Sequence, residues 1–147
     1  MNCPDCNVAL DERKYRGIEI DHCPQCRGLW LDFDEMDLLE DAANRDEILK
    51  GMREYARRSG ERPCPHCGAG MDIFNYRAHN LPIDHCPNDH GYWLDKGEED
   101  RILDLMRQRA RDLRRSESAE QQWARFMERG ASNGGFLDRI KDLFQGR

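Results

Sequence analysis

The chain has 147 residues, of which 35% are charged and 38% belong to the hydrophobic set, and its formal net charge at pH 7 is −6. The negative net charge argues against non-specific nucleic-acid binding, and no apolar run approaches the roughly 18 residues of a membrane-spanning helix. The first thirty residues contain Cys, Asp and Arg where a signal peptide would be apolar, which predicts a cytoplasmic protein.

The supply of apolar residues suits units that need additional stabilisation. Hydrophobic burial alone rarely holds a unit of about 30 to 40 residues, which usually needs a metal ion, disulfides or a partner. The chain has seven cysteines, and an odd number does not complete a disulfide framework. Clustered cysteines in a reducing cytoplasm are more often metal ligands. Composition therefore favours small units held by metal ions.

An internal duplication organises the sequence. The first copy spans residues 3–32 and the second spans residues 64–95. Both copies contain the run IDHCP, and both end in WLD two residues after a glycine. Cys, Trp and His are individually rare, so their alignment indicates two copies of one structural unit.

The first copy contains two Cys-x-x-Cys pairs, and each pair begins with Cys-Pro. Two intervening residues let a tight turn direct both sulfurs at one ion, and two such turns supply tetrahedral coordination. Asn7 follows the first pair and tolerates the left-handed backbone that such a turn needs. Four thiolates also suit iron, which stays open as the alternative metal. The predicted ligands are Cys3, Cys6, Cys23 and Cys26.

The second copy departs from this pattern at its fourth ligand. Asp89 occupies the position of Cys26, and His90 follows it. An imidazole reaches farther than a thiolate, which favours His90, while Asp89 and a metal-free second site stay open as alternatives. A nitrogen or oxygen ligand here also favours zinc over iron. The predicted ligands are Cys64, Cys67, Cys86 and His90.

Neither predicted site suits catalysis. A catalytic zinc ion keeps one coordination position open for water, whereas each set here supplies four side chains. Elsewhere in the sequence, no nucleophile, base and orienting group come together by spacing. We therefore predict two structural zinc ions, no catalytic residues and no enzymatic activity.

Each copy is expected to form a β-hairpin followed by a helix. The predicted strands span residues 8–15 and 18–22 in the first copy, and 71–76 and 81–85 in the second. Helices are predicted over residues 34–58, with Gly60 as the stop, and over residues 98–115. Ser118 and Gln121 resemble a capping box that starts a further helix. The apolar stripes of these helices are expected to pack between the two copies.

The motifs of both copies resemble the bacterial transcription factor IIB-type zinc ribbons. That family combines CPxC, a hairpin and CPxCxGxWLD before an acidic helix start; here the first copy has CPDC, CPQCRGLWLD and Glu35, and the second has CPHC, CPNDHGYWLD and Glu98. The resemblance covers each repeat and the start of each helix. It implies a zinc-ribbon fold with zinc at the residues named, and its name points to transcription, although a fold does not determine function.

The predicted class is therefore α+β, with two tandem zinc ribbons, each followed by an α-helix, and a flexible C-terminal tail. The predicted divisions are ribbon 1 at 1–33, helix and linker at 34–60, ribbon 2 at 61–97, a helical segment at 98–129, a flexible linker at 130–135 and an amphipathic motif at 136–147.

Two kinds of partner fit the sequence. The terminal motif places apolar residues from Phe136 to Phe144 on one helical face, which is typical of docking into a protein groove. We therefore predict a regulatory or adaptor module that acts through protein–protein contacts. Nucleic-acid binding is the alternative, because five arginines occur between residues 107 and 115. The sequence leaves the partner and the oligomeric state open.

Overall fold

The computed structural model describes residues 1–43 and 52–132, with side chains described as far as residue 129. Its fold is mixed α+β, and the chain divides into two compact units, Met1–Gln108 and Arg109–Arg147. No helix in the described part of the chain combines the length and the apolar character needed to cross a membrane.

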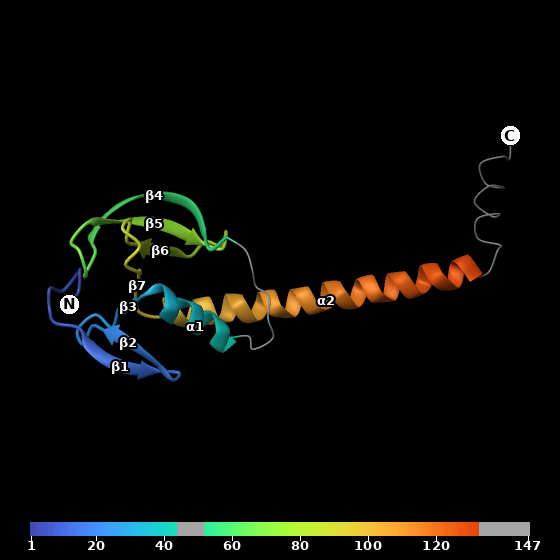
Figure 1. Cartoon of the computed structure of the whole chain (residues 1–147), viewed down its shortest axis with the longest axis horizontal. Coiled ribbons are helices and arrows are strands. Elements are labelled where there is room, and N and C mark those ends of the chain that lie inside the picture. Colours follow the sequence, from blue (N-terminus) through green and yellow to red (C-terminus); the bar gives the residue numbers. More distant parts are fainter. Residues whose placement is uncertain (44–51, 133–147) are drawn as a thin grey trace. The chain divides into compact units, whose positions relative to one another are not determined.

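A seven-stranded sheet forms the framework of the first unit, with the order β1-β2-β3-β7-β6-β5-β4. All neighbouring pairs are antiparallel. The elements are β1 (Asp11–Tyr15), β2 (Ile18–His22), β3 (Leu29–Leu31), α1 (Phe33–Ala43), β4 (Glu54–Pro63), β5 (Gly70–Tyr76), β6 (Pro82–His85), β7 (Tyr92–Leu94) and α2 (Glu98–Ser132). Figure 1 shows the hairpins β1–β2 and β5–β6 on either side of the β3–β7 junction.

The two copies meet about a local twofold axis at the β3–β7 junction. Trp30 pairs with Trp93 there, and these tryptophans occupy equivalent positions in the two copies. The preceding Gly28 and Gly91 are also equivalent. A Cβ atom at Gly28 would overlap the Trp93 ring, and one at Gly91 would overlap the carbonyl oxygen of Leu31. Each glycine therefore permits a close approach of the other copy.

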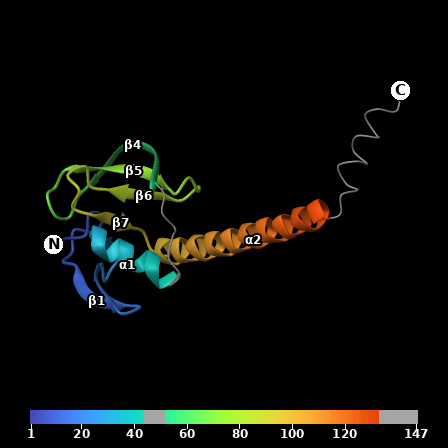
Figure 2. The same ribbon diagram turned by 45° about the vertical axis from the view of Figure 1, so that its right-hand side comes forward.

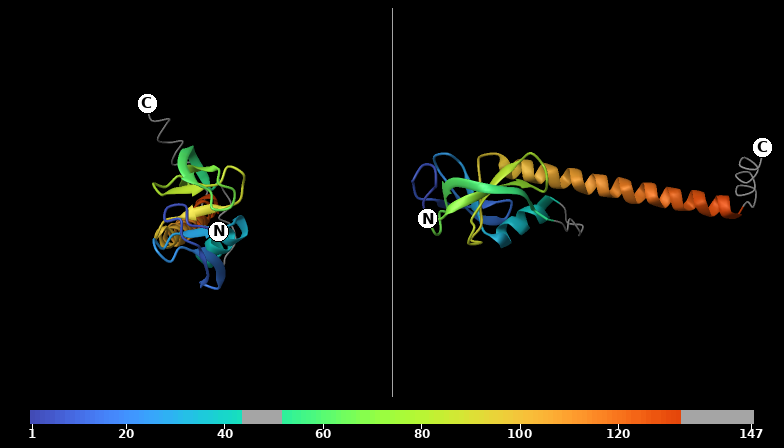
Figure 3. Two further views of the ribbon diagram at one scale, coloured as in Figure 1. Left: turned by 90° about the vertical axis from the view of Figure 1, so that its left-hand side faces the viewer. Right: turned by 90° about the horizontal axis from the view of Figure 1, so that it is seen from above.

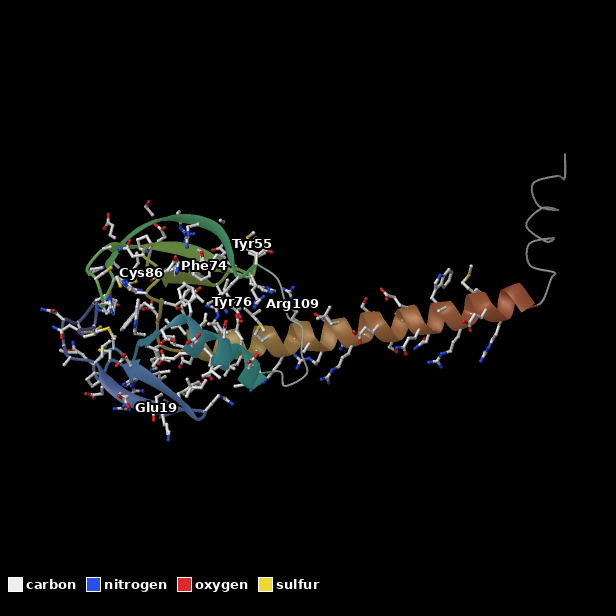
Figure 4. The ribbon with its side chains drawn as sticks, viewed as in Figure 1. Glu19, Tyr55, Phe74, Tyr76, Cys86 and Arg109 are labelled. Carbon is white, nitrogen blue, oxygen red and sulfur yellow. The ribbon has the colours of Figure 1, made fainter. Side chains whose placement is uncertain are left out.

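The junction separates two apolar clusters because side chains alternate between the faces of a strand. Trp30 and Trp93 lie with the cysteines on one face. On the other face, Leu29, Leu31 and Leu94 join a core that both helices cover. Figure 4 shows Phe74 and Tyr76 pointing from β5 into this core. The helical members of the core are Met36 and Leu39 of α1 and Ile102, Leu103 and Met106 of α2.

Capping boxes explain the acidic residues at both helix starts. The backbone N–H of Asp32 donates to Glu35 at 2.8 Å, and the N–H of Glu35 donates back to Asp32 at 2.8 Å. In the second copy, the N–H of Asp95 donates to Glu98 at 2.8 Å. These bonds satisfy donors that helices leave unpaired at their N-termini.

Each helix contacts the hairpin of the other copy. Glu40 of α1 is buried and accepts hydrogen bonds from Tyr76, from Arg77 at 2.9 Å and from Arg53 at 3.1 Å. Burial raises the pKa of Glu40, but the two guanidinium groups outweigh it and hold this pKa below its ordinary value. In the reciprocal contact, Tyr15 of β1 donates to Asp100 of α2 at 2.9 Å.

The predicted helix over residues 34–58 is wrong from residue 52 onward, and its residues 44–51 lie outside the described residues. As described, α1 ends at Ala43, and residues 54–63 form strand β4. Pairing with β5 and ion pairs such as Arg62 with Asp84 stabilise the extended form, and such tertiary contacts override a local helix preference. The expected stop, Gly60, instead lets β4 approach the carbonyl oxygen of Met71. The predicted boundary at residue 61 falls inside this strand.

Three smaller predictions also need correction. Strand β1 begins at Asp11, while Ala9 forms an isolated bridge with Asn2. Ser118 and Gln121 start no new helix, because α2 runs through them and has no proline or glycine beside them. The same helix includes residues 130–132, which were predicted to be a flexible linker. Residues 133–147, with the predicted tail motif, lie outside the described residues.

Replacing Glu40 by glutamine should destabilise the first unit. Glu40→Gln removes the buried carboxylate that pairs with Arg77 and Arg53, although Arg53 keeps its ion pair with Asp37. Breaking a buried pair in this way costs about 3–5 kcal/mol. Urea unfolding of the zinc-loaded chain, followed by tryptophan fluorescence, measures the loss. The exposed Asp41 on the same helix provides the control, since Asp41→Asn should change stability by no more than about 0.5 kcal/mol. Equal stability of the two variants would contradict the assignment.

Candidate metal centres

The first metal centre gathers all four cysteines of the first copy. The ligand atoms of Cys3, Cys6, Cys23 and Cys26 lie within 4.8 Å of one another, and the sulfurs of Cys3 and Cys26 are 3.6 Å apart. Zinc–sulfur bonds of about 2.3 Å in a tetrahedron place two sulfurs about 3.8 Å apart. The cluster therefore has the size and ligand chemistry of a structural zinc site.

Backbone turns around the cysteines create this arrangement. The N–H groups of Cys6 and Cys26 donate to the sulfurs of Cys3 and Cys23 at 3.3 and 3.4 Å. The chain then passes through left-handed residues, with φ of 56° at Asn7 and 65° at Arg27. The expected left-handed conformation of Asn7 is confirmed, and the turns leave backbone N–H groups facing the sulfurs.

The protein environment favours the thiolate form at one cysteine of this cluster and the neutral thiol at another. Burial opposes ionisation of Cys23, but N–H groups of Cys26 and Gln25 lower its pKa to about 7. Burial raises the pKa of Cys26 to about 12. A bound cation would lower the pKa of coordinating thiols and hold them as thiolates.

The second centre has three sulfurs and one imidazole. Ligand atoms of Cys64, Cys67, Cys86 and His90 lie within 4.8 Å of one another. Nδ1 of His90 lies 3.4 Å from the sulfur of Cys86, and the His90 ring stacks on that of His66 with centroids 4.1 Å apart. Three thiolates and one imidazole form a common structural zinc set. The two clusters therefore fit two structural zinc ions.

A tighter turn brings His90 into the cluster and turns Asp89 away from it. In the first copy, the N–H of Arg27 reaches back four residues to the carbonyl of Cys23. In the second copy, the N–H of Asp89 reaches back only three residues to the carbonyl of Cys86, and Asp89 takes the left-handed conformation with φ of 57°. The Asp89 side chain is 77% exposed. The structure thus places the alternative ligand outside the site.

Sequence reasoning missed one contact to a ligand. The side-chain amide of Asn88 donates to the sulfur of Cys67 at 3.4 Å. This bond is the main reason why the pKa of Cys67 falls to about 6. Asn88 lies between two ligands in the sequence. Its side-chain amide, which can donate a hydrogen bond, is the only feature of the sequence that indicates this contact.

The two histidines that precede ligand cysteines do not bond to sulfur in the described part of the chain. His85 is buried among the rings of Phe33, Phe74 and Tyr92. Burial lowers the pKa of His85, which favours the neutral imidazole. Burial also lowers the pKa of His22. Neither ring therefore supports a ligand sulfur through a hydrogen bond among the described residues.

Trp30 and Trp93 form a wall that the two centres share. Their exposed fractions are 3% and 0%, and both belong to the cluster that contains Cys3, Cys23, Cys64 and Cys86. The indole N–H of Trp93 donates to Asp95 at 3.1 Å, which satisfies its polar group. The tryptophans therefore screen the sites, whereas the opposite face of β3 and β7 anchors the helices.

Substitutions at adjacent positions should identify the fourth ligand of the second centre. His90→Ala removes an imidazole from the cluster, so native mass spectrometry should find one zinc ion per chain in place of two. Asp89→Asn should retain two, since asparagine tolerates the left-handed backbone at this position. Zinc loss in Asp89→Asn together with full occupancy in His90→Ala would show that the carboxylate is the ligand.

Chelation should open the first unit. Removal of both ions by EDTA at pH 7 leaves the cysteines without their common cation, so we expect thiol reactivity and a red shift of tryptophan emission as Trp30 and Trp93 become hydrated. Returning two equivalents of zinc should restore the original spectrum. Unchanged emission from a fully metal-free chain would refute a structural role, and iron in freshly purified protein would revise the metal.

Two stretches of the chain, residues 2–42 and 63–105, match the family model described as a transcription factor zinc-finger, the IIB-type zinc ribbon. Together they contain all eight clustered side chains and more than half of the sequence. Neither the curated proteins nor the solved structures include a match to this chain. The family match and the two centres agree that the chain belongs to the IIB-type zinc-ribbon family and carries two copies of its unit.

Proposed function

We propose that this zinc-binding protein is a non-enzymatic adaptor that works in the cytoplasm through protein–protein contacts. Each metal centre offers four side-chain ligands, so a tetrahedral zinc ion there keeps no position for a reacting water. A reducing compartment would keep these thiols available for zinc. Zinc then serves to hold the surfaces that meet the partner.

The observation that carries the proposal is an exposed aromatic patch on α2. Trp123 and Phe126 are 64% and 56% exposed, and their rings stack with centroids 5.6 Å apart. Met127 beside them is 49% exposed. None of the described side chains between residues 109 and 129 is buried. We call Trp123, Phe126 and Met127 the α2 patch.

Such a patch favours a protein partner. Aromatic residues and methionine are enriched at protein interfaces, and a few of them provide most of the binding energy. An isolated helix is also only marginally stable in water, so packing against a partner would stabilise this part of α2. The predicted tail motif from Phe136 to Phe144 offers a second candidate contact.

Loss of the two aromatic rings should weaken partner capture. Trp123→Ala/Phe126→Ala removes the centre of the α2 patch, and interface residues of this kind contribute enough binding energy for a loss of about tenfold or more. Quantitative affinity capture with the zinc-loaded chain measures the effect, and zinc content should stay at two ions. Gln121→Ala/Gln122→Ala is the matched control. Equal capture by the unmodified chain and both double variants would refute this role of the patch. Truncation after Gly130 measures the separate contribution of the tail motif.

Nucleic-acid binding is the second candidate, and the arginines of α2 favour it. Arg107, Arg111, Arg114 and Arg115 follow helical spacings of three and four residues, which place them on one side of the helix. Arg107 pairs with Asp104 at 3.1 Å and Arg115 with Asp112 at 3.7 Å, both within α2. Exposed Trp123 would supply a surface for base stacking.

A salt titration separates the two candidates. Contacts between arginines and phosphates release counterions, so nucleic-acid affinity should fall steeply with salt. Fluorescence anisotropy with labelled single-stranded RNA and duplex DNA measures this slope. Absence of binding at about 50 mM salt would exclude the nucleic-acid alternative and leave the protein-binding proposal standing.

A further inference from the structure

The duplication creates two equivalent surface hollows beside the hairpins. The first, of about 160 Å³, is lined by Glu12, Glu19, Ile20, Asp21 and Glu35. The second, of about 360 Å³, is lined by Ile73, Pro82, Asp84, Asp95 and Glu98, together with Arg58, Glu61 and Arg62 of β4. The registers agree, since Glu12 pairs with Asp21 as Ile73 pairs with Asp84.

In the second copy, an added strand fills this place. Strand β4 pairs with the outer edge of β5, with Arg58 opposite Ile73. From β4, Arg62 forms ion pairs with Asp84, with Asp95 at 3.1 Å and with Asp5 at 2.9 Å. Strand β4 is therefore an arginine-bearing strand that pairs with the hairpin of the second copy.

In the first copy, the corresponding edge has no strand among the residues that the structure describes. Strand β1 is the counterpart of β5 and ends the sheet, while β4 ends it on the opposite side (Figures 2 and 3). Two of the carboxylates that hold Arg62, those of Asp84 and Asp95, have counterparts in Asp21 and Asp32. Figure 4 shows Glu19 on this hairpin, away from the core.

The charges of the first hollow indicate which kind of ligand would bind there. Four of its five lining residues are carboxylates, and none is basic. A free sheet edge also offers unpaired backbone groups that accept an additional strand. A guanidinium group matches carboxylates through paired hydrogen bonds, which a simple cation does not reproduce. The edge and the charges therefore favour the same kind of ligand.

We propose that the outer edge of β1 binds an extended, arginine-bearing strand of a protein partner, which pairs with β1 as β4 pairs with β5. Its arginine then enters the hollow beside Asp21 and Glu12. The inference rests on the proposed adaptor function for the choice of a protein partner, but it uses a surface separate from the α2 patch.

A peptide copy of the internal strand tests this site. The probe is a fluorescein-labelled, end-blocked peptide with the sequence of residues 53–63, titrated against the zinc-loaded full chain by anisotropy. We expect saturable binding that weakens at least about tenfold in the Glu12→Gln/Asp21→Asn variant. The same loss should follow Arg62→Gln in the peptide, and Asp41→Asn in the chain should bind normally. Absence of binding, or binding indifferent to these changes, would overturn the proposal.

Amide chemical shifts locate the bound peptide. Changes confined to β1 and β2 support the proposal, whereas changes confined to β5 mean that the peptide displaces β4 and overturn it. Native mass spectrometry provides a further check, since a second copy that already fills the β1 edge would also overturn it. Trp123→Ala/Phe126→Ala should leave peptide binding intact, so failure of the α2 patch and failure of the β1 edge give different results.

Discussion

Coordination of two divalent cations by thiolates and one imidazole is the interaction on which the rest of the first unit depends. The ligands come from four turns that lie far apart in the sequence, and each ion joins two of them. Trp30 and Trp93 lie buried between the centres. Strong metal–ligand bonds add to the burial of the two apolar clusters and help to offset the entropy lost when the hairpins become ordered.

Pairing of the two ribbons turns a repeat into one compact unit. The sheet is continuous through β3 and β7, and Gly28 and Gly91 remove the side chains that would keep the copies apart. Helix α1 reaches the second hairpin through Glu40, and α2 reaches the first through Asp100. Because each helix contacts the opposite copy, loss of one metal centre should destabilise both copies.

The two copies differ in their fourth ligand and in the outer edge of their hairpins. The second copy has His90 as its fourth clustered side chain and carries β4 along its outer edge, where Arg62 links Asp84 and Asp95 with Asp5 of the first copy. The first copy has an acidic hollow, and no strand in the described part of the chain pairs with the outer edge of its β1. The duplicated scaffold thus has one outer edge covered by β4 and one that no described strand covers, besides the α2 patch in the second unit.

The sequence by itself determined the ligand clusters, the hairpins and the α+β class, because these depend on short spacings: a Cys-Pro turn aims its sulfurs locally, and Arg16-Gly17 closes its hairpin locally. Only the tertiary structure decided that His90 and not Asp89 enters the second cluster, since a one-residue change in turn length governs it. It also decided that residues 54–63 are a strand, because the edge of β5 and the carboxylate of Asp84 outweigh a weak helical preference. Contacts between residues distant in the sequence stabilise these arrangements, and no local sequence pattern predicts such contacts.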